Sequence, residues 1–346
     1  MRPLRLLHKG LPRICTENLL KSMTVITDLA SLEAVSAVPS GAVFILGHFD
    51  GVHLGHRSLF DEARRMIRDR SEDSGSAPAA VVWTLSGLDK GGCLTTEAEK
   101  LRLFRRLGAD YALSDAFSDI RDLDGESFFR QRIASASPSG LICGYNFTFG
   151  RGAAWRAEDL SRMASEAGIP CAVVPPCSVG GEPVSSTGIR KRVLAGDLDG
   201  AAQMLGRPYF VSGTVRHGKR IGHTIGFPTL NLRLPPCKVS PPRGVYASVV
   251  RWEENGSARL AAGVSNLGSR PTVNGDRDDV TLETNVFADP GDLYGAEITV
   301  WLLRFLRPEK KFGSVDGLQE AIALDREEAR RAADTLWSRY EDEFYL

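Results

Sequence analysis

The chain has 346 residues, which is enough for two ordinary domains that each bury a hydrophobic core. Basic and acidic residues both number 43, so the formal net charge is zero and gives no indication of a nucleic-acid partner. Hydrophobic residues make up 42%, and no run approaches the roughly 20 apolar residues of a membrane-spanning helix. The composition therefore excludes a disordered chain and a membrane-embedded one.

Residues 1–22 carry Arg2, Arg5, Lys9 and Arg13 among leucines but lack a long apolar core and a clear cleavage site. We expect them to be an unstructured extension upstream of a natural start at Met23, with a weak targeting peptide as the alternative. The six cysteines form no CxxC pair and have no histidine at metal-site spacing. This pattern predicts scattered reduced thiols in a cytoplasmic protein.

After Met23, short apolar runs alternate with amphipathic segments. Strands are predicted at 41–46, 79–84, 110–113, 140–143 and 170–175, with helices at 59–67, 95–107, 127–133 and 160–167. Thr96 and Glu99 have the spacing of a capping box at the start of the second helix. The alternation predicts an α/β doubly wound parallel sheet over 23–186, followed by a helical connector over 187–205.

The pattern changes from Gly206 onward, where closely spaced strand-like runs are separated by Gly, Pro and Asn. These runs lie at 209–215, 244–250, 260–264, 280–287 and 296–302. They predict an antiparallel β-barrel within a second domain over 206–346. Spaced apolar residues among charges in the last 30 or so positions predict one or two amphipathic C-terminal helices.

The turn after the first predicted strand reads Gly47-His-Phe-Asp-Gly-Val-His-Leu-Gly-His56. Its glycines permit close approach of a ligand, and His53 and His56 stand where the chain enters a helix. A helix N-terminus attracts anions, and imidazoles placed there can hydrogen-bond to phosphates and stabilise a transferring group. The whole pattern favours nucleotide binding over a metal site or a tight turn with incidental histidines.

Two later segments are relevant to function. Gly144-Tyr-Asn-Phe-Thr-Phe-Gly-Arg-Gly152 directly follows a predicted strand, and by itself it could be an aromatic-rich turn. Val184-Ser-Ser-Thr-Gly-Ile-Arg190 places hydroxyls and a guanidinium at the head of a helix, which suits phosphate oxygens. By itself, the second segment would be interpreted as an ordinary helix cap followed by a surface arginine.

The second half contains a glycine-rich segment, Gly213 to Gly226, that ends in Phe227-Pro-Thr-Leu-Asn231. Its glycines and basic residues predict a flap that can wrap phosphates, and the Thr and Asn side chains offer the hard oxygen ligands that Mg²⁺ prefers. Farther on, Glu283 is a carboxylate that could accept the proton of an alcohol attacking a γ-phosphate. The alternative for Glu283 is an exposed carboxylate on a strand.

These motifs, in this order, resemble the bifunctional riboflavin kinase/FMN adenylyltransferases, often called FAD synthetases, over nearly the whole chain after Met23. The resemblance implies a nucleotidyltransferase-like domain followed by a riboflavin-kinase-like barrel. It implies Mg²⁺ and ATP as cofactor and co-substrate, with riboflavin, FMN and FAD as substrates and products. The expected partners are then small molecules, and neither a nucleic acid nor a membrane is expected as a partner. The resemblance does not decide whether the protein forms a homo-oligomer.

The resemblance also assigns roles to individual residues. For adenylyl transfer it implies charge stabilisation by His53, His56 and Arg190 and nucleotide contacts at Gly47, Phe49, Asp50, Gly51, Gly55, Asn146, Arg151, Ser186 and Thr187. For the kinase it implies Glu283 as the base, metal contacts at Thr229 and Asn231, and nucleotide contacts at Gly218, Lys219 and Gly222. Tyr294 and Phe305, in segments that also match the family, are expected in the core, with stacking on a flavin as the alternative.

Two positions depart from the family's pattern. The loop Thr84-Leu-Ser-Gly-Leu-Asp-Lys90 lacks the Pro-His-Pro that the family usually carries there, and Asn285 stands where many relatives have a histidine. The altered loop leaves a monofunctional riboflavin kinase with a degenerate first domain as one alternative. A non-catalytic flavin-binding regulator is the other.

Overall fold

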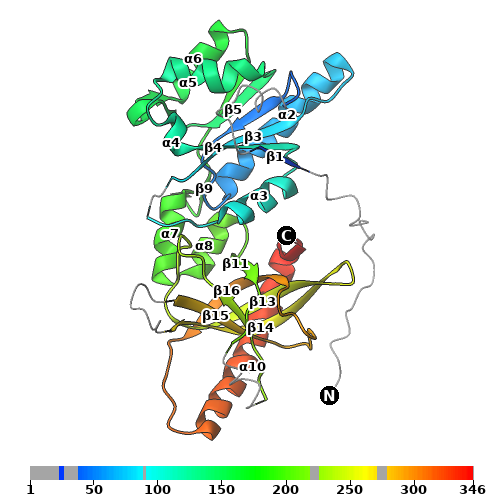
Figure 1. The fold of residues 1–346 in the computed structure, drawn as a ribbon, viewed down its shortest axis with the longest axis vertical. Helices are drawn as coiled ribbons and strands as arrows, with labels where there is room; N and C mark the ends of the chain where they lie inside the picture. The colour runs from blue at the N-terminus through cyan, green and yellow to red at the C-terminus, as the bar shows by residue number, and fades with distance from the viewer. Residues whose placement is uncertain (1–22, 27–37, 89–90, 219–225, 271–278, 346) are drawn as a thin grey trace.

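The computed structural model describes residues 23–26, 38–88, 91–218, 226–270 and 279–345, which form two units connected by a pair of helices (Figure 1). The first unit contains a six-stranded parallel sheet with the order β1-β4-β3-β2-β5-β8. Its strands are β1 Thr24–Ile26, β2 Val43–Leu46, β3 Ala80–Ser86, β4 Tyr111–Ala116, β5 Gly140–Gly144 and β8 Cys171–Val174. The predicted α/β sheet is confirmed, although β1 at its edge was not predicted.

Helices connect these strands. They are α2 Leu54–Ser74, α3 Glu97–Arg106, α4 Phe117–Ile120, α5 Gly125–Phe128, the π-helix η2 Phe129–Ile133 and α6 Ala157–Glu166. The predicted capping box of α3 is present, because Thr96 accepts from the Glu99 N–H and Glu99 accepts from the Thr96 N–H. The single helix predicted over 127–133 is instead divided between α5 and η2.

The order of the strands determines where a ligand can bind. The chain builds β2, β3 and β4 in one direction and then returns to place β5 and β8 on the other side of β2. Leu46 pairs with Cys143, so β2 and β5 end side by side. Ligands of open parallel sheets bind outside the carboxyl ends of the strands at such a reversal. The Gly47–His56 turn and the Gly144–Gly152 segment both begin there.

The second unit is a curled antiparallel sheet with the order β11-β16-β13-β14-β15-β12. Its strands are β11 Tyr209–Thr214, β12 Leu230–Arg233, β13 Gly244–Glu254, β14 Ser257–Arg270, β15 Asp279–Val286 and β16 Glu297–Arg307. The sheet curls so far that its two edges meet, where the Arg216 N–H donates to the Asn231 carbonyl across 2.9 Å. The predicted barrel is thus confirmed as a curled half-barrel, and β12 is a strand that the sequence pattern did not indicate.

One long helix, α10 Val315–Tyr340, packs against β13, β14 and β16 and is followed by the short 3₁₀ helix η5 Glu341–Tyr345. Of the one or two C-terminal amphipathic helices predicted, the structure therefore has mainly one. Between the two units lie α7 Ser186–Ala195 and α8 Leu198–Leu205, the latter packed against β11 and β16 (Figure 1). Two small hairpins complete the first unit, β6 Thr148–Phe149 with β7 Trp155–Arg156 and β9 Ser178–Val179 with β10 Glu182–Pro183.

The two units share a buried ion pair. Glu99 of α3 is 1% exposed and pairs with Lys238 of the second unit, whose side chain is fully buried. The other oxygen of Glu99 accepts from the Ser212 N–H of β11 at 2.9 Å. A buried ion pair is stable only when hydrogen bonds satisfy its remaining polar atoms, and Glu99 meets that condition with backbone N–H groups from both units.

The cysteines of the described part of the chain are all free thiols. The Sγ atoms of Cys93 and Cys237 lie 2.9 Å apart across the same interface. No helix in the described ranges has the length and apolarity that crossing a bilayer requires.

We predict that Glu99→Ala lowers the free energy of unfolding by roughly 3–5 kcal/mol, because it leaves the Lys238 ammonium buried without its partner. Chemical denaturation followed by far-UV circular dichroism measures this loss. Glu166→Ala, which removes an exposed partner of Arg162, is the matched control and should change stability by about 1 kcal/mol or less. Equal effects of the two substitutions would contradict the buried ion pair.

Candidate functional site

The turn that connects β2 to α2 has an unusual backbone. Phe49 and Val52 have φ of 57° and 40°, and Gly51 between them has φ of 83°. Left-handed conformations cost roughly 1–3 kcal/mol at non-glycine residues and persist only where surrounding structure holds them. A Cβ on Gly51 would lie 2.9 Å from the Leu94 side chain, so this position also requires glycine for space.

Asp50 connects this turn to two other segments. Its Oδ1 accepts from the Leu94 N–H at 2.7 Å and the Thr95 N–H at 3.2 Å, and its Oδ2 accepts from Arg190 of α7 at 2.8 Å. The side chain is 5% exposed. The Asp50 carbonyl also accepts from the Ser186 hydroxyl at 2.8 Å. The structure therefore brings the first and third sequence motifs together through contacts within the protein.

Arg190 is held in place by this arrangement, since its Nε also donates to the Gly92 carbonyl at 3.2 Å. Ser185 caps α7 by accepting from the Gly188 N–H, and Ser186 and Thr187 form the first turn of that helix. Thr187 thus stands at a helix N-terminus, a position that favours anions. Direct contact of Ser186, Thr187, Asp50 or Arg190 with a nucleotide stays a prediction.

The two histidines stack on each other with their ring centroids 3.6 Å apart. His53 is the N-cap of α2, and its Nδ1 accepts from the His56 N–H at 3.3 Å. In a neutral imidazole that accepts at Nδ1, the proton is on Nε2, which leaves a donor for a ligand. Gly55 packs against His53, since a Cβ there would lie 3.3 Å from the imidazole. The edge of the Phe49 ring faces His56, and a Cβ on Gly47 would lie 3.0 Å from the Phe49 ring.

Both histidines are neutral at physiological pH. Burial, reinforced by the Arg207 charge, lowers the pKa of His53 from 6.5 to about 4. Burial and the neighbouring charges of His53, His48, Arg207 and Lys100 lower the pKa of His56 well below 6.5. Neutral imidazoles at the N-terminus of a 21-residue helix can donate hydrogen bonds to a phosphate and need not gain a proton to do so.

The segment after β5 is held by close packing. Gly150 has φ of 74°, and a Cβ there would lie 2.9 Å from the Trp155 ring. Asn146 and Arg151 are exposed, and the Arg151 N–H donates to the Leu123 carbonyl at 2.6 Å. Their side chains are accessible from solvent near the carboxyl edge of the sheet. Their predicted nucleotide contacts remain untested.

The loop that departs from the family's pattern also contacts the turn. Thr84, at the end of β3, is fully buried and donates to the His48 carbonyl at 3.1 Å. Lys100 of α3 reaches the same place, where its Nζ donates to the Leu85 carbonyl at 3.0 Å. Residues 89–90 of this loop lie outside the described residues. Lys100 has no motif that could reveal it in the sequence, because α3 brings it to the turn only in the fold.

A second constellation lies on the curled sheet. Glu283 of β15 pairs in register with Asn231 of β12 on one side and with Asn266 of β14 on the other. Residues directly opposite on neighbouring strands have their side chains on the same face, with Cβ atoms about 4.5–5.5 Å apart. Asn266 also donates to Glu309 at 3.2 Å. The register therefore places a carboxylate between two carboxamides.

Thr229 and Gly218 complete this constellation. The Asn231 amide donates to the Thr229 carbonyl at 3.1 Å, and its nitrogen lies 3.5 Å from the Thr229 hydroxyl. A Cβ on Gly218 would lie 2.6 Å from the Asn231 side chain, so the glycine-rich segment passes directly over it. Lys219 and Gly222, the other flap residues of the prediction, lie outside the described residues.

Asn285, which stands where many relatives carry histidine, is also part of this region. Its Nδ2 donates to the Pro228 carbonyl at 2.7 Å, and its Oδ1 accepts from Arg326 of α10. The asparagine thus connects α10 to the residue before Thr229. The sequence showed only that position 285 differs from the histidine of many relatives. The contacts depend on a helix some 40 residues later in the chain.

Tyr294 is not in the core, contrary to the prediction, because it is 41% exposed and its ring lies 3.9 Å from that of His217. Phe305 packs edge-on against Tyr246 and is partly buried. Tyr294 therefore lies beside the start of the glycine-rich segment. Sequence alone could not distinguish an aromatic residue of a turn from one of the core.

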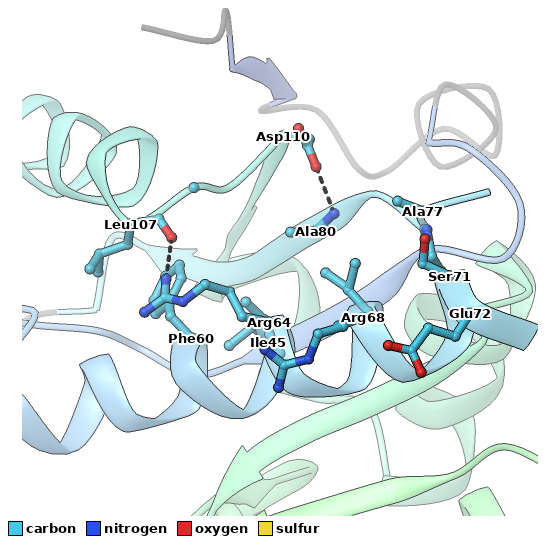
Figure 2. A pocket seen from close by; sticks show the side chains of 14 residues that line it. Ile45, Phe60, Arg64, Arg68, Ser71, Glu72, Ala77, Ala80, Leu107 and Asp110 are labelled. Atoms are coloured by element: carbon cyan, nitrogen blue, oxygen red, sulfur yellow. Dashed lines mark hydrogen bonds between the residues drawn. The ribbon is translucent and has the colours of Figure 1, made fainter. Parts of the chain in front are cut away.

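A cavity of about 400 Å³ lies away from both constellations (Figure 2). It is lined by α2, the start of β3 and the turn after α3, where Arg64 donates to the Leu107 carbonyl and Asp110 accepts from the Ala80 N–H (Figure 2). No residue of either constellation is among those that line it. The predicted ligand-binding groups lie instead at strand ends and on the sheet face.

Two family models match the chain, FAD synthetase over residues 35–188 and riboflavin kinase over residues 205–333. A bifunctional riboflavin kinase/FMN adenylyltransferase of Bacillus subtilis is 32% identical over 84% of this chain and 92% of its own length. The chain belongs to the bifunctional riboflavin kinase/FMN adenylyltransferase family. The Escherichia coli member is 35% identical over 85% of this chain and 93% of its own length.

A solved structure matches the fold over nearly the whole chain. A crystal structure described as a macrolide-efflux protein of Streptococcus pneumoniae matches with a TM-score of 0.77 at 29% identity. The match covers 89% of this chain and 99% of that one. The family resemblance is therefore confirmed by the family models and relatives, and the predicted fold by the solved structure.

We predict that the histidines make the protein less stable as the pH falls from 6.5 toward 4. Their pKa is lower in the folded than in the unfolded chain, so the unfolded state binds more protons in this range. Because an asparagine at position 53 can keep the cap, His53→Asn should lose less stability over that range than the wild type does. Thermal unfolding midpoints from pH 7 to pH 4 measure the difference, and identical slopes would contradict it.

Proposed function

We propose that the chain phosphorylates riboflavin to FMN and then adenylylates FMN to FAD, using ATP in both steps. The observation that carries the proposal is the register of Asn231, Glu283 and Asn266, beside Thr229, within a chain whose two halves each match one of the family's two models. The domains are proposed as 23–186 and 206–346, with 187–205 as the connector. We also propose that the protein acts in the cytoplasm, where ATP is made and used.

In the kinase step, the 5′-hydroxyl of riboflavin attacks the γ-phosphorus of ATP. The proton of the hydroxyl passes to Glu283, the new P–O bond forms, and the bond between the γ-phosphorus and the bridging oxygen breaks to release ADP. Glu283 suits this role because it lies on a rigid strand between two carboxamides, which can orient the carboxylate and the alcohol.

The residues present fit a Mg²⁺ that arrives with ATP. Thr229 offers a hydroxyl oxygen and Asn231 a carboxamide oxygen, and the two side chains are neighbours, with the Asn231 nitrogen 3.5 Å from the Thr229 hydroxyl. Mg²⁺ usually binds through one or two protein groups plus phosphate oxygens and water. No group of three or more His, Cys, Asp or Glu side chains in the described ranges could hold a metal by itself. When bound, Mg²⁺ would neutralise charge on the transferring phosphate. The asparagine and threonine would position it.

In the adenylyl step, an oxygen of the FMN phosphate attacks the α-phosphorus of ATP, and the bond to the β-phosphate breaks to release pyrophosphate. The attacking phosphate is already an anion, so the site needs no base. His53 and His56 would donate hydrogen bonds to the α-phosphate from the N-terminus of α2, while Thr187 would bind phosphate at the N-terminus of α7. Asp50 and Arg190 would hold these two helix ends in register.

One alternative follows from a specific observation. The loop after β3 lacks the family's Pro-His-Pro, so a kinase with an inactive first domain remains a second candidate. Incubation of the purified protein with riboflavin, Mg²⁺ and ATP, followed by separation of the flavins, distinguishes the two. Formation of both FMN and FAD supports both activities, and formation of FMN alone supports the alternative. The absence of both products would overturn the enzyme assignment.

We predict that Glu283→Gln lowers kcat for FMN formation about 10²- to 10⁴-fold, the usual contribution of a positioned general base. Formation of FAD from added FMN should remain at the wild-type rate, because that site lies in the other half. Glu254→Gln, at an exposed position of β13, is the control. Wild-type FMN formation by the Glu283 variant would refute the assigned base.

We also predict that Asn285→Asp raises KM for Mg²⁺-ATP in the kinase reaction roughly tenfold, the equivalent of one buried hydrogen bond. An aspartate still accepts from Arg326 but cannot donate to the Pro228 carbonyl, so the turn before Thr229 is released. Initial rates of FMN formation at varied Mg²⁺-ATP measure the effect. An unchanged KM would show that the Pro228 contact does not position the metal-binding turn.

A further inference from the structure

A buried arginine of the kinase half contacts the turn of the adenylyltransferase half. Arg207 directly follows α8 and Gly206, and it is 1% exposed. Its Nη2 donates to the Gly51 carbonyl at 2.6 Å and its Nη1 to the Val52 carbonyl at 3.0 Å. Nη1 also lies 3.3 Å from the Leu205 carbonyl. The guanidinium thus holds two successive carbonyls of the turn with the two arms of its fork.

Burying a cation costs desolvation free energy, and the Arg207 guanidinium donates its hydrogen bonds to backbone carbonyls. Burial, together with the charge of Arg57, lowers the pKa of Arg207 to about 9, while Glu343 and Glu99 partly oppose that effect. The planar fork of arginine is suited to holding two acceptors at fixed positions, which a flexible ammonium does less well. The cost is consistent with a need to fix these carbonyls in place.

The two carbonyls belong to the strained part of the turn. Gly51 and Val52 both have positive φ, and a β-branched residue such as Val52 is disfavoured there more than most. Asp50 holds the same turn from the other side through its bonds to Leu94, Thr95 and Arg190. The strained backbone is therefore fixed between a buried anion of its own and a buried cation of the kinase half.

The turn leads directly into the histidine pair. Val52 is followed by His53, which caps α2 and accepts from the His56 N–H. A second contact from the kinase half reaches Arg57, the residue after His56. Glu343 of η5 accepts two hydrogen bonds from Arg57, at 2.8 and 2.9 Å. The residues just before α2 and the first turn of α2 are thus each held by a residue that lies after the connector.

We propose that Arg207 is a positioning residue for adenylyl transfer, so that the kinase half supplies part of the structure that the adenylyltransferase site requires. The inference rests on the proposed role of the Gly47–His56 turn in that reaction. Arg207 acts through the carbonyls of Gly51 and Val52, which set the place of His53 and His56. Its charge also adds to burial, the main cause, in lowering the pKa of both histidines.

The test compares Arg207→Met and Arg207→Lys in the full chain, with Arg304→Met as the control. Arg304 lies 3.8 Å from Asp199 of α8 near the same interface and is 45% exposed. Formation of FAD from FMN and Mg²⁺-ATP, formation of FMN from riboflavin, and the thermal midpoint are measured for each protein. Arg207→Met should lower kcat/KM for FAD formation about 10- to 100-fold and leave FMN formation within about twofold.

The pH profile separates positioning from simple support of the fold. A protonated His53 cannot accept from the His56 N–H, so FAD formation should decline where the histidines gain protons. Removing the Arg207 charge raises the pKa of both histidines, so the decline of FAD formation at low pH (the acid limb of the profile) moves to higher pH. His48 and Lys100 still lower the pKa of His56 in the variant. Arg207→Lys keeps the charge, so it should lose rate but retain the wild-type acid limb.

Three results would overturn the proposal. Equal losses of FAD and FMN formation that follow the thermal midpoint would show a structural role only, and unchanged FAD formation in Arg207→Met would show no role. A wild-type chain that makes FMN and no FAD would instead refute the proposed adenylyl transfer, and the positioning role with it. If Arg207→Met does not fold, Arg207→Lys decides, because an unchanged rate of FAD formation in that variant contradicts the need for the fork.

Discussion

The Gly47–His56 turn depends on two buried charges of opposite sign. Its backbone is in left-handed conformations at Phe49, Gly51 and Val52, and such a chain would relax if nothing held it. The Asp50 carboxylate accepts from two N–H groups and Arg190, while the Arg207 guanidinium donates to the carbonyls of Gly51 and Val52. Because these contacts come from α7, the segment before α3 and the kinase half, the turn keeps its form only when the whole chain is folded.

The two candidate sites are built in different ways. The kinase site lies on paired strands, where the register alone brings Asn231, Glu283 and Asn266 together. The adenylyltransferase site lies at the ends of strands and helices, so loops and caps must position its groups. Strands hold side chains more tightly than loops do, which makes the first site the more independent of the two. The second needs supports from distant segments, and the interface between the halves supplies some of them.

Buried charge at that interface also gives a reason for keeping two activities in one chain. Glu99 pairs with Lys238 and accepts from the Ser212 N–H, and Glu343 pairs with Arg57. Exposing such groups to solvent by separating the halves would leave a helix start, a strand and a strained turn without their partners. The interface is therefore specific in its geometry, since each carboxylate has only one arrangement that satisfies it.

Much of the fold followed from the sequence alone. Apolar runs such as 41–46 and the Thr96–Glu99 capping box depend on neighbours within a few residues, so their structures could be predicted, and the motif order placed both halves in one family. Only the tertiary structure showed that β12 is a strand, that Arg207 and Lys100 reach the histidine turn, and that Asn285 connects α10 to Pro228. These features join residues that are far apart in the chain, and no local pattern records which buried charge will meet which carbonyl.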